Sequence, residues 1–169
     1  MAATYEPIAS QTLGSAAASI TFNSIAASWT DLRIVLVGTN SALYAGANLR
    51  FNSDSGTNYS TTILYGTGSS AGSYRVSNAS QVDLFSSFGG NTTMPQMSTV
   101  DIFSYAGSTY KTFLWNNANN QTVTGGSGTI SPSVGLWRSS SAITSISITA
   151  STGNWNTGTS VTLWGIKAA

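Results

Sequence analysis

The chain has 169 residues, only 7% of them charged, and a formal net charge of +1, so we expect a polar but nearly neutral surface. Its basic residues are spread from Arg33 to Lys167 without forming a patch, which argues against nucleic acid or an anionic membrane as a partner. The sequence contains neither Cys nor His. It therefore excludes disulfides and thiol nucleophiles, and it lacks the residue most often used as a general base or transition-metal ligand.

One domain, covering residues 1–169, is expected at this length. No linker, internal repeat or shift in composition divides the chain. No apolar run approaches the length that crosses a bilayer, and the first residues lack the basic segment that opens a secretory signal peptide. A surface this poor in charge provides little repulsion between copies, which favours a protein that sits in an assembly.

Short runs of alternating apolar and polar residues, the pattern of half-buried strands, recur along the whole chain. Turn-forming residues separate most of them, and no helical period of useful length interrupts the series. This pattern predicts an all-β protein, an antiparallel β-sandwich or barrel. The expected strands cover residues 4–9, 16–23, 31–39, 49–52, 59–66, 81–85, 97–105, 110–116, 133–138, 142–150 and 160–167. Long connections are expected at 86–95 and at 116–128, with a brief strand at Val123 as the alternative within the second.

The most apolar of these runs, 31–39, is expected to be a central strand. Ile34 and Leu36 should face one side of the sheet, and Val35 and Val37 the other. Because both sets are apolar, we expect all four side chains to be largely buried, as in a strand covered on both faces.

Residues 49–66 contain two strand-like runs, 49–52 and 59–66, separated by a cluster of Asn, Ser, Asp and Gly. We expect the two runs to be neighbouring antiparallel strands. The residues between them favour turns, because their side chains bind nearby backbone groups or because they tolerate positive φ. A connection longer than a two-residue hairpin needs such internal hydrogen bonds to hold its shape.

This connection has a superficial likeness to a calcium loop, because Asn52, Asp54 and Asn58 place oxygen atoms at alternate positions around Gly56. In an EF-hand loop the Gly stands one position later, and a Glu ends the loop where this chain has Ile63. One carboxylate also supplies little charge for a cation. We therefore interpret the segment as a turn in which Asp54 and the Asn side chains bind backbone N–H groups, and we expect no metal and no other cofactor.

The same connection resembles a motif of small structural proteins of tailed bacteriophages, Phe-Asn-x-Asp-x-Gly-x-Asn-Tyr-Ser, here at residues 51–60. The runs Tyr-Glu-Pro-Ile-Ala, Ile-Thr-Phe and Thr-Asp-Leu-Arg within 5–33 are similar to the usual opening of these proteins. Residues 142–146 and 161–167 are similar to their usual ending, with Trp164 where Tyr is expected. The resemblance spans nearly the whole chain.

The resemblance implies a single jelly-roll domain on a phage virion, made in the host cytoplasm. We also expect the protein to assemble as a homotrimer, because its surface has few charges and its loops carry aromatic residues that suit an interface. The leading hypothesis is a capsid decoration (cement) protein that stabilises the head and contacts other virion proteins such as the major capsid protein. The alternative is a receptor-binding or carbohydrate-binding module of the tail or fibre, with a host-surface glycan as its partner. The sequence pattern alone does not distinguish head from tail.

The acids are few and far apart in sequence, and no local pattern places two carboxylates across one bond, as a glycosidase requires. We therefore expect a protein that is not an enzyme and has no catalytic residues. Arg33 and Arg50 lie inside apolar strands, where each is expected to pair with an acid or to extend its charged end into water. The five acids are Glu6, Asp31, Asp54, Asp83 and Asp101, of which Asp31 and Asp101 are the expected partners.

Aromatic residues are plentiful, with five Trp, seven Tyr and six Phe. A sugar-stacking platform is one role for the Trp residues, although most of them are expected in the core or at subunit contacts. Trp155 lies in a polar loop where a core role is least natural, and Tyr74 lies in the expected loop 67–78. These two residues, with Asn154 and Asn156, are the candidate contact residues; the alternative is that each aromatic ring pins its own loop.

Overall fold

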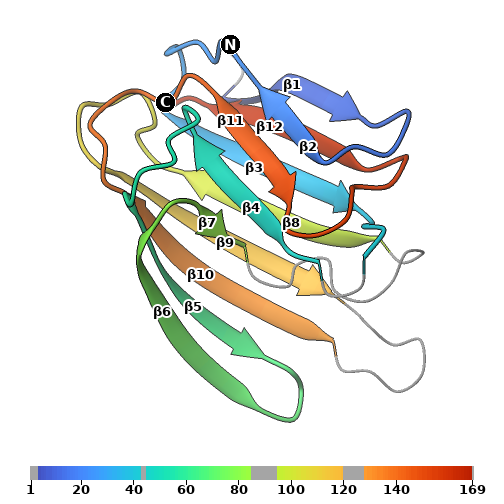
Figure 1. Ribbon diagram of the computed structural model, residues 1–169. Coiled ribbons are helices and arrows are strands. Elements are labelled where there is room, and N and C mark those ends of the chain that lie inside the picture. The colour runs from blue at the N-terminus through green and yellow to red at the C-terminus, as the bar shows by residue number, and fades with distance from the viewer. Residues whose placement is uncertain (1–3, 43–44, 85–94, 120–127, 169) are drawn as a thin grey trace.

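The computed structural model describes residues 4–42, 45–84, 95–119 and 128–168. Within them, twelve β-strands form two antiparallel sheets packed face to face, and no helix is long and apolar enough to cross a membrane (Figure 1). The strands are β1 (Tyr5–Thr12), β2 (Ser19–Phe22), β3 (Asp31–Gly38), β4 (Ala47–Phe51), β5 (Tyr59–Gly66), β6 (Ala71–Ala79), β7 (Val82–Asp83), β8 (Gln96–Ile102), β9 (Lys111–Asn119), β10 (Thr129–Trp137), β11 (Ile146–Ala150) and β12 (Ser160–Ile166).

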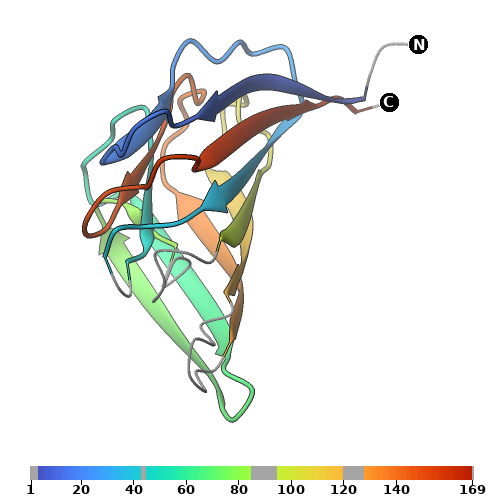
Figure 2. The same ribbon diagram turned by 90° about the vertical axis from the view of Figure 1, so that its right-hand side faces the viewer.

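The larger sheet has eight strands in the order β1-β12-β3-β8-β9-β10-β5-β6, and the smaller sheet has four in the order β2-β11-β4-β7. Every pair of neighbouring strands is antiparallel. The smaller sheet lies over part of one face of the larger sheet, and the β5–β6 hairpin projects beyond it (Figures 1 and 2). The face toward the smaller sheet is called the inner face here, and the opposite one the outer face.

Eight of these strands make a jelly roll. One of its sheets is β1-β12-β3-β8 and the other is β2-β11-β4-β7, and the chain passes between them as β1, β2, β3, β4 and then β7, β8, β11, β12. The prediction of an all-β antiparallel sandwich of the jelly-roll type is confirmed. The other four strands are two inserted hairpins, β5–β6 and β9–β10, which lie side by side because β10 pairs with β5. We call these four strands the extension.

The strand predicted at 31–39 lies inside the larger sheet, where β3 pairs with β12 and β8. Its inward side chains Ile34 and Leu36 are buried. Val35 and Val37 alternate with them, as predicted, but Val35 is only half-buried and Val37 is 37% exposed. The expectation that both faces are buried is wrong, because the smaller sheet covers only the inner face of the larger one.

The two runs of 49–66 are not neighbouring strands, contrary to expectation. β4 pairs with β11 and β7 in the smaller sheet, whereas β5 pairs with β10 and β6 in the larger one. The connection between them therefore crosses from one sheet to the other. Proximity in sequence favours a hairpin, but a loop of this length also spans the distance between two packed sheets.

Two of the expected loops are partly strand. The segment 67–78 contains most of β6, because pairing with β5 holds these Gly- and Ser-rich residues extended in spite of their low strand propensity. β9 and β10 both extend into the expected loop 116–128. The middle of that loop, with Val123, and all but the last residue of the expected connection 86–95 lie outside the described residues.

A cluster of buried aromatic rings packs the extension against the jelly roll. Phe51 of β4 stands at its centre, with ring centroids 5.4 Å from Phe113 and 5.5 Å from Trp137. Tyr59 completes the cluster, 6.2 Å from Phe51 and 6.3 Å from Trp137. The Phe113 ring lies against Gly135 of β10, where an added Cβ would stand 2.1 Å from it, so only Gly fits at that position.

The loop between β4 and β5 is the self-bonded turn that the sequence predicts. Asp54 Oδ1 accepts a hydrogen bond from the backbone N–H of Gly56 (2.8 Å), and Oδ2 accepts one from Asn58 Nδ2 (2.9 Å). A donor from outside the loop, Trp137 Nε1, also binds Oδ2, at 2.7 Å. Burial alone would raise the pKa of Asp54, but the three hydrogen bonds outweigh it and hold that pKa below its usual value.

Asn52 ties the start of this loop to the segment before β11. It adopts a positive φ of 51°, which Asn tolerates better than most residues. Its Oδ1 accepts hydrogen bonds from the backbone N–H groups of Thr144 (2.8 Å) and Ser145 (3.1 Å), and its Nδ2 donates to the carbonyl of Ala142 (2.8 Å). The amide therefore fixes the position at which the chain leaves the smaller sheet.

Leu36 and Val37, adjacent in β3 but on opposite faces, provide a matched pair of substitutions. Leu36→Ala should lower the free energy of unfolding by about 2–5 kcal/mol, because it removes buried methyl groups and leaves a cavity. Val37→Ala should lower it by less than about 1 kcal/mol, since this side chain is already partly in water. Denaturant unfolding measures both, and equal losses would contradict the one-sided burial of β3.

Asp54→Ala should lower the free energy of unfolding at neutral pH by about 0.5–2 kcal/mol, because the loop N–H groups and Trp137 lose their acceptor. The pKa of Asp54 is lowered in the folded state, so its stabilisation is present above the unfolded-state pKa and is lost as the pH falls through the folded-state pKa. Wild type and variant should therefore converge in stability in acid, as measured by unfolding at several pH values.

Calcium should leave the melting temperature of the wild type unchanged, and a clear rise would revive the metal-loop interpretation.

Candidate functional site

Trp155 is fully buried, so the prediction that it is a surface contact residue is wrong. Its backbone N–H donates to the carbonyl of Ala17 at 2.8 Å, and its own carbonyl accepts from the Ala17 N–H at 3.1 Å. A second β-bridge joins it to Asn40. The polar loop before β12 is thus held to two other segments while the Trp155 indole packs in the core. This is the alternative in which the aromatic ring pins its own loop.

The two Asn residues beside Trp155 have different roles. Asn156 is half-buried, and its Nδ2 donates to Thr39 Oγ1 at 2.9 Å while its backbone N–H binds the Thr39 carbonyl at 3.0 Å. Asn154 is exposed, its backbone N–H donates to Ser41 Oγ at 3.0 Å, and within the described residues its side chain makes no hydrogen bond. Of the pair, only Asn154 offers its side chain to a partner.

Tyr74, the fourth predicted contact residue, lies on β6 opposite Ile63 and is half-buried against the core. Burial raises the pKa of its hydroxyl to about 12, with smaller contributions from the charge of Asp83 and from Tyr65. It belongs to a strand of the extension, whereas the other three candidates share the loop before β12. The structure therefore divides the predicted contact residues between two places.

The Trp residues form no exposed sugar-stacking platform in this structure, since none of the five is exposed. Trp164, which is half-buried, is stacked against Tyr5 with ring centroids 4.7 Å apart. Trp29, also half-buried, has the Lys167 amine 5.0 Å from its ring centroid. The buried ones are Trp115, Trp137 and Trp155.

Trp155→Ala should lower the free energy of unfolding by about 3–5 kcal/mol, because it empties a large, fully buried volume. Asn154→Ala is the neighbouring control, and it should change stability by no more than about 0.5 kcal/mol because its side chain is exposed. Thermal unfolding of both variants compares them. A Trp155→Ala protein as stable as the wild type would mean that the indole is a surface group after all.

The outer face of the larger sheet carries a set of exposed apolar side chains, centred on the extension. Strand pairing sets them side by side: Val37 lies opposite Met97, and Leu114 opposite Val134. Leu64 is 54% exposed and Ile130 is 60% exposed. Contiguous apolar surface of this kind marks interaction sites in soluble proteins. We call the set the outer apolar face: Val37, Leu64, Met97, Leu114, Ile130 and Val134.

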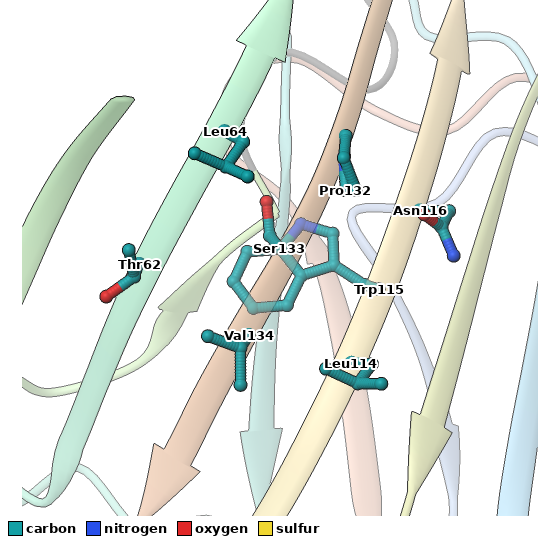
Figure 3. A pocket seen from close by; sticks show the side chains of 8 residues that line it. All are labelled: Thr62, Leu64, Leu114, Trp115, Asn116, Pro132, Ser133 and Val134. Atoms are coloured by element: carbon teal, nitrogen blue, oxygen red, sulfur yellow. The ribbon is translucent and has the colours of Figure 1, made fainter. Parts of the chain in front are cut away.

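A hollow of about 300 Å³ lies in this face, over β9, β10 and β5 (Figure 3). Leu64, Leu114 and Val134 line it from three neighbouring strands, and Trp115 lies behind β10, on the inner face. Pro132, which also lines it, has no backbone N–H to donate, and the β10–β5 pairing passes from Ile130 to Ser133 without pairs at Ser131 and Pro132. The hollow therefore lies where proline interrupts the ladder.

A second hollow of about 240 Å³ adjoins the first, since Thr62 and Val134 line both. Its other lining includes Arg75, which is exposed at the β6 side of the outer apolar face. At the β3 and β8 side, Arg33 Nε lies 2.5 Å from Asp101 Oδ1, the ion pair that the sequence predicts. The face between these groups is uncharged, so its partner should be neutral and largely apolar.

Arg50 makes a different contact from the one expected. Its Nε donates to the backbone carbonyl of Ser80 at 3.3 Å, and within the described residues it forms no ion pair. The guanidinium therefore fixes the connection between β6 and β7.

The outer apolar face was not among the predicted contact residues, although the sequence holds a signal for it. Ile63-Leu64 and Phe113-Leu114-Trp115 place apolar residues at consecutive positions of a strand, which requires apolar side chains on both faces of a sheet. In 31–39 the same signal led us to expect burial on both faces. In β3, as in β5 and β9, the second set of side chains lies on the outer face of the sheet and is partly exposed to water.

No protein-family model matches the sequence, and no curated protein matches it either. Among solved structures, Caenorhabditis elegans galectin LEC-6 is 11% identical, with 94% of this chain and 96% of that chain covered and a TM-score of 0.35. The CBM2 module of the evolved Dit of Lactobacillus casei BL23 phage J-1 is 12% identical, with 89% and 69% covered and a TM-score of 0.19. At TM-scores this low, neither structure indicates what this chain does.

Proposed function

We propose that this chain is a non-enzymatic structural protein of a bacteriophage virion, and that it decorates the head as a cement protein. In this proposal it assembles as a homotrimer at the surface of the phage particle, after synthesis in the host cytoplasm. It docks on the major capsid protein through the outer apolar face. The resemblance of residues 51–60 and of both ends of the chain to phage structural proteins motivates this assignment.

The outer apolar face carries the proposal. Six large apolar side chains stand exposed on one face of a rigid sheet, over a shallow hollow and with an uncharged centre. Burying such a face against a partner removes apolar surface from water, which is the main driving force of stable association. A shell of identical subunits offers many copies of one fixed partner surface, which suits a docking face that is rigid and uncharged.

The acids support a role without catalysis, since most of them have structural partners. Asp101 is paired with Arg33, Asp54 binds its own loop and Trp137, and Asp31 Oδ1 accepts the backbone N–H of Ser104 at 2.7 Å. Within the described residues, no three acids converge on one point. A carboxylate that is held by fixed donors is a poor general base, because those donors stabilise the anion and so lower its affinity for a proton.

The double substitution Leu64→Asp and Ile130→Asp tests the docking face. Both side chains are more than half exposed, so the fold should survive, while two charges on an apolar interface should weaken binding to heads assembled without the protein at least about tenfold. Co-sedimentation with such heads measures the binding. Tyr110→Asp is the matched control, because Tyr110 is 58% exposed just before β9 and lies outside the outer apolar face.

Two outcomes would contradict this proposal. One is equal binding of wild type and double variant to the heads. The other is antibody labelling of virions, seen by electron microscopy, that is confined to the tail. Analytical ultracentrifugation tests the homotrimer separately, and a strictly monomeric protein at high concentration would remove that part of the proposal.

A further inference from the structure

In the extension, the inner face of β5 and β6 lies beyond the edge of the smaller sheet. That edge is β7, which has only two residues and pairs with β4. A cavity of about 470 Å³ lies here, within the size range of ligand sites. Thr57 of the loop before β5, Thr61 of β5 and Val76 of β6 line it, together with residues of the segment 78–83. We call it the β6–β7 pocket.

The polar side chains that line this pocket have free hydrogen-bonding capacity. Asn78 Oδ1 is occupied by Arg138 Nη2 at 2.8 Å, but within the described residues the Asn78 amide N–H groups make no hydrogen bond. The same holds for the amide of Gln81 and for the carboxylate of Asp83. The pocket thus presents amide donors, an amide acceptor and one carboxylate acceptor, with an apolar surface at Val76.

The walls of the pocket are fixed before any ligand arrives. Arg138 donates to Asn78, to Ser60 Oγ at 2.5 Å and to the backbone carbonyl of Thr57, so one guanidinium joins three segments. Arg50 holds the Ser80 carbonyl on the connection to β7. Both guanidinium groups therefore make their hydrogen bonds to the protein itself. A pocket whose walls are held in this way loses little conformational entropy on binding.

Asp83 is the group in this pocket that most needs a partner. The residue as a whole is exposed, yet the surrounding protein desolvates its carboxyl and raises its pKa. No hydrogen bond or ion pair within the described residues offsets this cost. A ligand hydroxyl that donates to this carboxylate would replace the lost water.

We propose that the β6–β7 pocket binds one neutral sugar unit, such as the terminal residue of a surface glycan. Sugar hydroxyls donate to Asp83 and accept from the amides of Asn78 and Gln81, and a C–H face of the ring packs on Val76. A cationic ligand fits less well, because Asp83 is the one acid among the lining residues and the guanidinium groups of Arg50 and Arg138 are bonded to lining residues from behind. This site differs from the outer apolar face and does not depend on the proposed function.

The test uses the full chain and the methyl glycosides of glucose, galactose, mannose and N-acetylglucosamine as probes, followed by ligand-observed NMR. At least one probe should bind with a millimolar Kd. Asp83→Asn and Gln81→Ala should each weaken it about tenfold, as expected for the loss of one well-placed hydrogen bond to a buried or charged group. Glu6→Gln, which removes one acid from β1 at the opposite edge of the larger sheet, should leave the Kd unchanged.

Binding of none of the four probes would overturn this inference, as would equal binding by wild type and both pocket variants. Asp83→Asn removes a desolvated charge, so its melting temperature should be no lower than that of the wild type, which separates lost binding from lost folding. The double substitution Leu64→Asp and Ile130→Asp should still bind the sugar. Failure of head docking and failure of sugar binding are therefore distinguishable.

Discussion

The packing of Phe51 between the two sheets is the contact on which the rest of this structure depends. The jelly roll alone would end its larger sheet at β8, and the four strands of the extension continue it. Phe51 belongs to the smaller sheet, but its ring packs against Phe113, Trp137 and Tyr59, all from the extension. Its backbone N–H also donates to the Tyr59 hydroxyl at 3.1 Å. The same short segment therefore ends β4, crosses between the sheets and holds the added strands in place.

The size of the extension relative to the smaller sheet creates both candidate sites. A four-stranded sheet cannot cover eight strands, so the inner face of β5 and β6 is left beside the short edge strand β7, where the polar pocket lies. On the outer face, widening the sheet brings β9, β10 and β5 together and sets Leu114, Val134 and Leu64 in one surface. One face of the extension thus suits a broad apolar partner, and the other a small polar ligand.

Sequence patterns predicted the parts of this fold that depend on local alternation. The strand at 31–39, its two sets of side chains and the turn around Asp54 all follow from residue types a few positions apart. Local patterns did not predict which strands pair, because β4 and β5 are adjacent in sequence but pair in different sheets. Trp155 was misplaced for a related reason: its neighbours are polar, and only bridges to the distant residues Ala17 and Asn40 carry its ring into the core. The two candidate sites likewise arise from strands that are far apart in the chain.

The few charges of this protein are used mainly inside it, and this limits what its surface can recognise. Lys111 is buried, with its amine bound to the carbonyls of Gly107 and Thr109, and Arg138 clamps the wall of the β6–β7 pocket. Arg33 and Asp101 neutralise each other on the outer face. Long-range electrostatic steering is therefore weak for such a molecule, and its association rates should depend little on salt. Recognition must come from shape, apolar contact and neutral hydrogen bonds at short range, which are the properties that the outer apolar face and the β6–β7 pocket provide.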